Sequence, residues 1–221
     1  MRDLSIEGSP PVTAIVDALA VGEARLTRRQ LADLVTQIGL QDDLWRPIVR
    51  HDFDHRWYIR LHWSRSVEVW LLGWRPGQDT QVHDHGGSSG AFVVTEGTLA
   101  ERYGSVERWA GGRRRHHLRG RACWFGPDYA HNLGNAGLGV ATSVHAYSPP
   151  LSTMTYYGTD VPVLVPRQTV FTSGPEPGID LALATSADGY AAPVPGSLEQ
   201  VWAGRVGAEQ AEQVGAVLVD R

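Results

Sequence analysis

The chain contains no lysine, so all 20 basic side chains among its 221 residues are arginines. The missing amine excludes Schiff-base catalysis, a lysine-anchored pyridoxal phosphate and the lysine of a phosphate-binding P-loop. Cysteine occurs once, as Cys123. A single thiol excludes an internal disulfide, a paired-cysteine redox site and a cysteine zinc cluster.

Long apolar runs and an excess of positive charge are missing as well. No stretch approaches the roughly 18 apolar residues of a membrane-spanning helix. The first seven residues lack the charged-then-apolar order of a secretory signal. The formal net charge is −4, so no positive field attracts nucleic acid or an anionic membrane. We therefore expect a cytoplasmic protein with no nucleic-acid and no membrane partner.

The N-terminal part of the chain has a helical pattern. Within residues 12–40, apolar side chains recur at helical spacing from Leu31 to Ile38. Thr27 and Gln30 have the spacing of a capping box, and Gly39 suits a helix end. These features predict helix over this region.

From residue 56 to about residue 165, short runs rich in Val, Leu, Trp and Tyr alternate with turn residues, a pattern that predicts strands. The expected strands are Val67–Trp74, Ala91–Thr95, Thr98–Tyr103, Ala122–Phe125 and Gly139–Tyr147. We interpret the basic run Arg113–His117 as a solvated hairpin and Cys123 as a small buried apolar residue.

Three regions follow from these patterns. We expect a helical segment over residues 1–55, a small antiparallel β-barrel over 56–165, and a C-terminal extension over 166–221. In the extension, residues 166–196 are rich in Pro, Gly and Ala, which predicts an extended arm. One or two short helices are expected within 198–219. The predicted fold class is mainly β.

Histidine, with nine copies, is the abundant ligand-forming residue. His83 and His85 are two residues apart, so on a strand both point to one face, into the barrel. Two neutral imidazoles on one face supply half of a transition-metal site. His131 is the candidate third ligand.

The segments that contain these histidines resemble the two motifs of the cupin superfamily. The first motif, Gly-x5-His-x-His-x3/4-Glu-x6-Gly, is matched from Gly77 to Gly97, except that Gly90 replaces the usual glutamate ligand. The second motif is matched loosely, from Pro127 through His131. Three histidines without a carboxylate leave about three positions of a six-coordinate ion open. That number suits an Fe(II) ion that must hold a chelating substrate and O₂ together.

The segment Ser143–Pro150 narrows the resemblance. Together with the histidine motifs it resembles the cysteine dioxygenase family of thiol dioxygenases over residues 56–157, which implies a cupin-type double-stranded β-helix. The resemblance also implies one Fe(II) per chain, bound by His83, His85 and His131. It further implies a catalytic relay of Ser143, His145 and Tyr147, with the tyrosine hydroxyl at the iron.

The resemblance extends to substrate binding. Arg60 matches the family's Tyr-x-Arg segment, whose arginine grips the α-carboxylate of cysteine, and a guanidinium fork fits a carboxylate. Tyr58 and Trp74 are further candidate substrate-binding residues. The branch that oxidises 3-mercaptopropionate typically has glutamine in place of this arginine. Animal members carry, at the position of Gly90, a cysteine cross-linked to the tyrosine, so no such thioether with Tyr147 is expected.

The sequence therefore predicts a dioxygenase that converts L-cysteine and O₂ to cysteine sulfinate, as a monomer or homodimer. One alternative is the same chemistry on another small thiol, such as 3-mercaptopropionate. A second is a non-catalytic metal-binding cupin that senses or stores a small ligand. A third is a zinc, nickel or manganese isomerase or lyase, because three histidines accept several metals.

Overall fold

The computed structural model describes residues 10–19, 24–53, 56–158 and 163–171. The helices of this part are α1 (Pro10–Leu19), α2 (Arg28–Gly39) and α3 (Asp42–Trp45). The helical region expected over 12–40 is thus divided into two helices, with α1 ending at Leu19. Among the described residues, no helix combines the length and hydrophobicity needed to cross a membrane.

The predicted start of α2 is confirmed. The Thr27 hydroxyl accepts a hydrogen bond from the backbone of Gln30, whose side chain accepts one from the Thr27 backbone, which completes a capping box. Gly39 is the last residue of α2. A Cβ atom there would lie 2.7 Å from Cγ1 of Val93, so this glycine lets the helix end approach the sheet closely.

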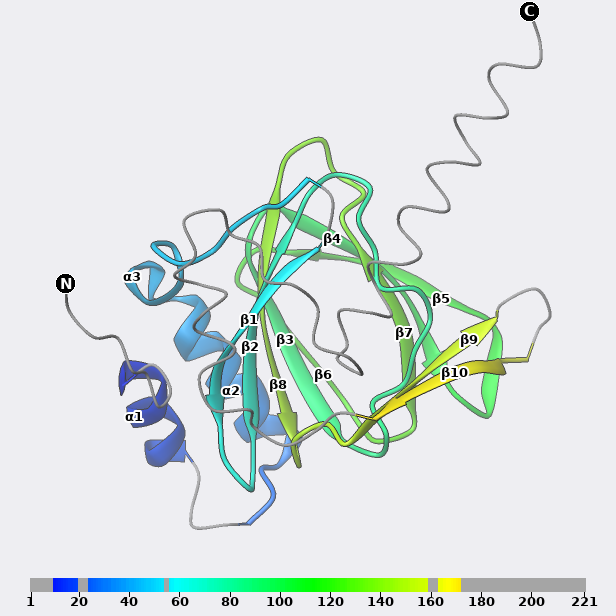
Figure 1. The fold of residues 1–221 in the computed structure, drawn as a ribbon, viewed down its shortest axis with the longest axis horizontal. Helices are drawn as coiled ribbons and strands as arrows, with labels where there is room; N and C mark the ends of the chain where they lie inside the picture. The colour runs from blue at the N-terminus through cyan, green and yellow to red at the C-terminus, as the bar shows by residue number, and fades with distance from the viewer. Residues whose placement is uncertain (1–9, 20–23, 54–55, 159–162, 172–221) are drawn as a thin grey trace, which may run out of the picture.

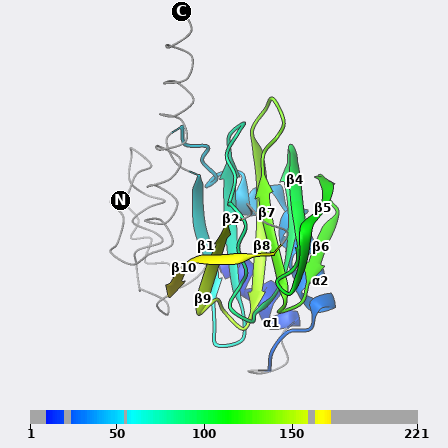
Figure 2. The ribbon, with the colours of Figure 1, turned by 90° about the vertical axis from the view of Figure 1, so that its right-hand side faces the viewer.

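The strands form antiparallel sheets. The first sheet has the order β1 (Trp57–Trp63), β2 (Glu68–Trp74), β8 (Ala141–Ser148), β3 (Ser89–Glu96), β6 (Ala122–Phe125). The second contains β5 (Arg108–Leu118), β4 (Thr98–Ser105) and β7 (Tyr129–Gly134), and β9 (Thr153–Gly158) pairs with β10 (Val165–Phe171). Figure 2 views the molecule from the side of the second sheet.

A short extended segment, residues 79–83, joins β7 to β9. Asp79 forms a bridge with Gly134, and His83 forms bridges with His131 on one side and Tyr156 on the other. The second layer therefore continues from β7 through this segment to β9 and β10. One layer has the strand order β2-β8-β3-β6. The facing layer has the order residues 79–83, β7, β4, β5. These are the strand orders of a double-sheet jelly roll.

The expected fold class, a mainly β cupin-type double-stranded β-helix preceded by helices, is confirmed. The closed barrel is not formed, because the described strands make separate sheets whose outer strands do not pair with each other. Residues 166–171, expected at the start of the extended arm, are strand residues of β10 paired with β9. The expected helices within 198–219 lie outside the described residues.

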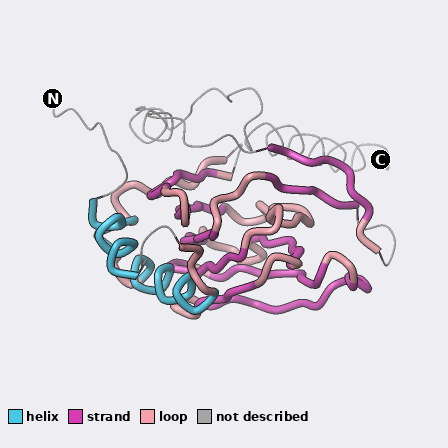
Figure 3. The backbone as a smooth tube through the Cα atoms, turned by 90° about the horizontal axis from the view of Figure 1, so that it is seen from below, coloured by secondary structure: helices cyan, strands magenta, loops and turns pink. Residues whose placement is uncertain are grey.

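Two apolar clusters sit on the two faces of the first sheet. One fills the space between the helices and the sheet, with Leu34, Ile38 and Val144 fully buried; Figures 1 and 3 show the helices along this flank. The other fills the space between the two sheets. Because strand residues alternate between faces, β8 directs Val144 and Ala146 toward the helices. The alternate residues Ser143, His145 and Tyr147 point into the space between the sheets.

Candidate metal centre

Three histidines meet between the two sheets. One ring nitrogen from each of His83, His85 and His131 lies within 4.8 Å of the other two, and the residues are at most 3% exposed. His83 lies on the bridged segment and His131 directly opposite it on β7, where each backbone N–H donates to the other residue's carbonyl at 2.9 Å. His85 lies beyond the paired part of the segment, so the regular strand expected beneath His83 and His85 is not formed.

The hydrogen bonds of the three rings leave nitrogens available for a metal. Nδ1 of His83 donates to the carbonyl of Gln81 at 3.1 Å, and Nδ1 of His131 donates to the Glu101 carboxylate at 2.7 Å. In both rings the remaining lone pair is on Nε2. Neither ring nitrogen of His85 makes a hydrogen bond of good geometry within the described structure, although both are buried and the backbone of Tyr129 is nearby. A buried imidazole without such a bond fits a metal ligand.

The electrostatic setting keeps the imidazoles of His83 and His85 neutral. Burial, and next the neighbouring imidazole of His131, hold the pKa of His83 and His85 well below the ordinary value for histidine. A neutral imidazole is the form that binds a metal. The donor set fits a divalent first-row transition ion, with His83, His85 and His131 as its ligands.

Asp84, between two of the histidines, anchors the ligand segment to β9. Its carboxylate accepts hydrogen bonds from the backbone N–H groups of Gly86 at 3.0 Å and Thr155 at 3.2 Å, and from the Tyr157 hydroxyl at 2.5 Å. The side chain is therefore occupied by β9 rather than by the histidine cluster. Its role is to hold the histidine-bearing backbone in place.

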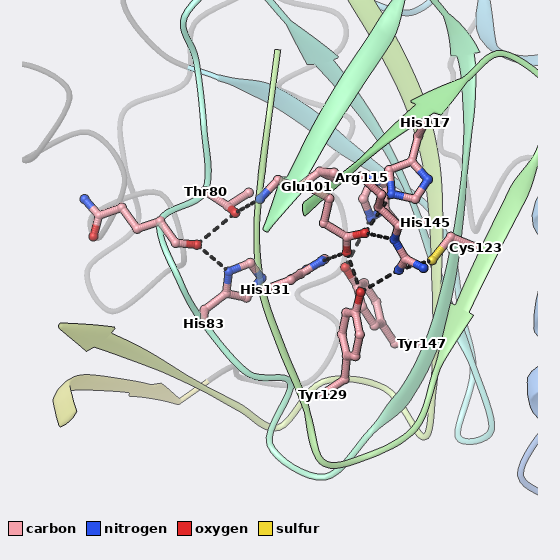
Figure 4. A network of polar contacts seen from close by, with 12 residues as sticks. Thr80, His83, Glu101, Arg115, His117, Cys123, Tyr129, His131, His145 and Tyr147 are labelled. Atoms are coloured by element: carbon pink, nitrogen blue, oxygen red, sulfur yellow. Dashed lines mark hydrogen bonds and ion pairs between the residues drawn. The ribbon is translucent and has the colours of Figure 1, made fainter. Parts of the chain in front are cut away.

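A second support comes from residues just before His83. Gln81, whose carbonyl receives the His83 N–H, has a positive φ of 57° and donates its own N–H to Asp79 at 2.9 Å. Thr80 donates its hydroxyl proton to the same carbonyl at 3.0 Å and accepts the N–H of Leu133 at 2.9 Å. Figure 4 shows Thr80 beside His83. An unusual backbone conformation is thus held by side-chain hydrogen bonds where a ligand must be aimed.

The expected relay residues are hydrogen-bonded in series along the inward face of β8. Ser143 Oγ lies 2.8 Å from His145 Nε2, and His145 Nδ1 lies 3.4 Å from the Tyr147 hydroxyl. The indole N–H of Trp74 donates to Ser143 Oγ at 2.8 Å. Burial, and next the charge of Glu68, raise the pKa of Tyr147 above the ordinary phenol value, so this hydroxyl keeps its proton.

A cavity with an empty volume of about 490 Å³, including its opening to solvent, lies beside the cluster. It is bordered by two of the histidines, by the end of the relay and by a largely apolar wall. The lining residues are Tyr58, Trp70, Leu72, Thr80, His83, His131, Leu133, His145, Tyr147, Leu151 and Met154.

Two of the expected substrate-binding residues do not line this cavity. Trp74 is fully buried behind it, where the guanidinium of Arg56 lies 4.7 Å from its ring centroid. Arg60 has its guanidinium 5.1 Å from the ring centroid of Trp70 and 3.8 Å from the Glu68 carboxylate. Trp74 therefore supports the relay instead of contacting a ligand, and Tyr58 is the member of the expected set that borders the cavity.

A buried polar network behind His131 did not follow from the sequence. It includes Glu101, Arg115, His117 and Tyr129 (Figure 4). The solvated hairpin expected for Arg113–His117 is borne out in part, because these residues lie on β5, which forms a hairpin with β4, and three of the five are exposed. Arg115 and His117 differ, since their side chains face the interior. Cys123 is buried as expected but accepts a hydrogen bond from Arg115. One signal was present: Glu101 shares the inward side of an alternating strand with Leu99.

A jelly roll with three histidines gathered between its sheets defines a cupin-type metalloprotein. A sequence model of the family described as cysteine dioxygenase type I matches residues 24–160. The chain therefore belongs to the cysteine dioxygenase type I family. The match begins before the first strand and includes α2.

Solved structures with a similar fold come from several microorganisms. TT1209 from Thermus thermophilus is 21% identical, with 48% of this chain and 93% of that chain covered and a TM-score of 0.42. An uncharacterized conserved protein with a double-stranded β-helix domain from Klebsiella pneumoniae is 18% identical, with coverages of 50% and 86% and a TM-score of 0.44. BH2720 from Bacillus halodurans is 18% identical, with coverages of 53% and 79% and a TM-score of 0.40.

Proposed function

We propose that the protein is a mononuclear non-haem Fe(II) thiol dioxygenase that converts L-cysteine and O₂ to cysteine sulfinate. The observation that carries the proposal is the cluster of His83, His85 and His131 beside a cavity that the Tyr147 hydroxyl also borders. Three protein ligands leave open positions for a substrate and for O₂. Membership in the cysteine dioxygenase type I family supports the same chemistry.

The three histidines would hold the iron, which when bound lowers the pKa of a substrate thiol and brings thiolate and O₂ within bonding reach. The other residues around the cavity bind and orient the substrate. Apolar side chains such as Leu133, Leu151 and Met154 border the cavity and exclude loose water from the reactants.

The relay has a defined direction. An indole N–H can only donate, so Ser143 accepts from Trp74 and has its own proton available for Nε2 of His145. Burial holds the pKa of His145 well below its ordinary value, so this ring is neutral and carries its proton on Nδ1. That N–H faces the Tyr147 oxygen, which leaves the tyrosine's own proton free to point toward a bound reactant.

One observation favours a second candidate, a dioxygenase for another small thiol such as 3-mercaptopropionate. Arg60, the residue expected to bind the cysteine carboxylate, lies against Trp70 and near the Glu68 carboxylate rather than among the cavity-lining residues. If the substrate does not engage Arg60, the argument for an amino-acid thiol loses its main support.

The test is O₂ uptake by protein loaded anaerobically with Fe(II), with cysteine and 3-mercaptopropionate offered separately and products identified by mass. We expect a gain of two oxygen atoms on cysteine, and a larger loss of kcat/KM for cysteine than for 3-mercaptopropionate in Arg60→Gln. Oxidation of 3-mercaptopropionate alone would establish the second candidate. Full iron occupancy without thiol oxidation would contradict both, and would favour a binding protein or a metal-dependent isomerase or lyase.

A further inference from the structure

We propose that Glu101 is the positioning residue for His131: its buried carboxylate fixes the orientation of this imidazole and leaves Nε2 as the metal-binding nitrogen. The inference rests on the metal centre of the proposed function and is independent of the substrate. It assigns a role to a residue that no motif of the sequence singled out.

The carboxylate of Glu101 accepts four hydrogen bonds. Oε1 receives His131 Nδ1 and the Tyr129 hydroxyl, each at 2.7 Å. Oε2 receives Arg115 Nε at 2.6 Å and His117 Nε2 at 2.7 Å. Each oxygen thus has two donors, and the residue as a whole is 2% exposed. A carboxylate satisfied on both oxygens cannot rotate without breaking several short hydrogen bonds.

The network also fixes which partner donates. The Tyr129 hydroxyl accepts from Arg115 at 2.6 Å, so its single proton goes to Glu101. Glu101 itself is ionised, because it forms an ion pair with the guanidinium of Arg115, whose Nε lies 2.6 Å from Oε2. An ionised carboxylate only accepts, so the imidazole of His131 must present Nδ1–H to it.

This arrangement decides how His131 meets a metal. With Nδ1 bound to Glu101, the lone pair on Nε2 faces the cluster formed with His83 and His85. A carboxylate behind a metal-bound histidine orients the ring and increases its basicity. His83 receives the weaker support of a backbone carbonyl, from Gln81. In the described part of the chain, Glu101 is the one carboxylate that is hydrogen-bonded to any of the three rings.

The same residues are not a second metal site. Glu101, His117 and Cys123 also place ligand atoms within 4.8 Å of one another. However, the guanidinium of Arg115 donates to Glu101 and, at 2.8 Å, to the sulfur of Cys123. The guanidinium of Arg115 therefore already supplies the positive charge that balances the Glu101 carboxylate.

The test titrates the metal-free protein with Co(II), which reports affinity and ligand geometry through its visible absorption without any turnover. In Glu101→Gln the amide N–H₂ must face two donors whichever way it turns. We expect the Kd for Co(II) to rise about 10- to 100-fold, with a shifted absorption spectrum of the bound ion. The matched control is Leu99→Ala, a fully buried residue two positions away on β4.

The control separates positioning from simple support of the fold. Leu99→Ala should lower the melting temperature through a cavity while its Kd for Co(II) stays within about threefold of the wild-type value, well below the 10- to 100-fold effect of losing a ligand's hydrogen-bond partner. If Glu101→Gln gives the same pattern as Leu99→Ala, the proposal is wrong. If the iron-loaded wild-type protein oxidised no thiol while Glu101→Gln still gave the expected weakening of Co(II) binding, only the proposed function would be contradicted.

A second measurement needs no variant. Nitrogen NMR of the ¹⁵N-histidine-labelled, metal-free protein distinguishes the two neutral forms of an imidazole. We expect His131 to carry its proton on Nδ1. An Nδ1 without a proton would overturn the proposal even if Glu101→Gln failed to fold.

Discussion

The imidazole of His85 stacks on the ring of Tyr147, with centroids 5.2 Å apart and planes inclined by 26°. Phe125 contacts the same imidazole at a centroid distance of 4.7 Å. His85 is thus held by aromatic neighbours, whereas His83 and His131 are held by hydrogen bonds. This packing sets the ring beside the relay tyrosine and leaves both of its nitrogens without a hydrogen bond of good geometry among the described residues.

Replacement of His85 by alanine should abolish stoichiometric metal binding. Two imidazoles remain, which is too few to retain a divalent ion against dialysis, so we expect fewer than about 0.1 iron per chain by elemental analysis. The control is His116→Ala, which removes an exposed histidine on β5. Full iron in His85→Ala would show that this ring is a packing residue.

Gly90→Ala should destabilise the fold. The new Cβ would lie 2.6 Å from Cε2 of Phe125 and 3.0 Å from Cδ1 of Tyr147, and overpacking of this kind costs about 1–3 kcal/mol. Urea unfolding measures the change. The control Gly139→Ala adds a Cβ with nothing within 4 Å and should change the free energy of unfolding by less than about 0.5 kcal/mol. Equal stability of both variants would refute the packing argument.

The thiol of Cys123 should be inert in the native protein. It is 7% exposed, and burial, followed by the Glu101 carboxylate, raises its pKa to about 12 against the opposing effect of Arg115. Because the thiolate is the reactive form, a thiol reagent at pH 8 should leave it unmodified until denaturant is added. Since the chain has no other cysteine, prompt modification of the folded protein would directly contradict this burial.

His62 should make stability fall at mildly acidic pH. Burial lowers the pKa of this side chain in the folded protein, against the charge of Asp17. The unfolded chain therefore binds protons below about pH 6.5 more readily than the folded one. The stability that the folded protein gains from keeping His62 neutral is complete above that pH and is lost as the pH falls below it. Urea unfolding at several pH values should show a shallower acid slope for His62→Gln than for the wild type, and identical slopes would exclude this role.

Much of the fold was predictable, since it depends on local patterns. The capping box of Thr27 and the inward side of the strand at Ser143 and Tyr147 follow from spacing alone. The arrangement of the strands in two layers was harder to predict. The histidine spacing suggested a strand at His83 and His85, but no local pattern shows that residues 79–83 pair with their neighbours only through single bridges at Asp79 and His83.

The histidine cluster was predictable and the residues that support it were not. Motif spacing grouped His83, His85 and His131, but Glu101 and Arg115 meet through pairing of β4 with β5 and β7. A charge-rich stretch such as the one around Arg115 has the composition of a solvated surface. Only the alternation of its side chains, with every second one turned inward, distinguishes it, and that alternation acquires meaning once the sheet register is known.

The direct pairing of His83 with His131 ties the metal site to the alignment of the sheet. Since successive strand residues face opposite sides, one extra residue between Asp79 and His83 would turn the His83 ring away from the cluster. One ligand would then be lost without any change of residue type. Metal affinity in this protein therefore depends on the register of residues 79–83 with β7. Insertions or deletions in this segment should weaken metal binding far more than those at the exposed turn near Leu138.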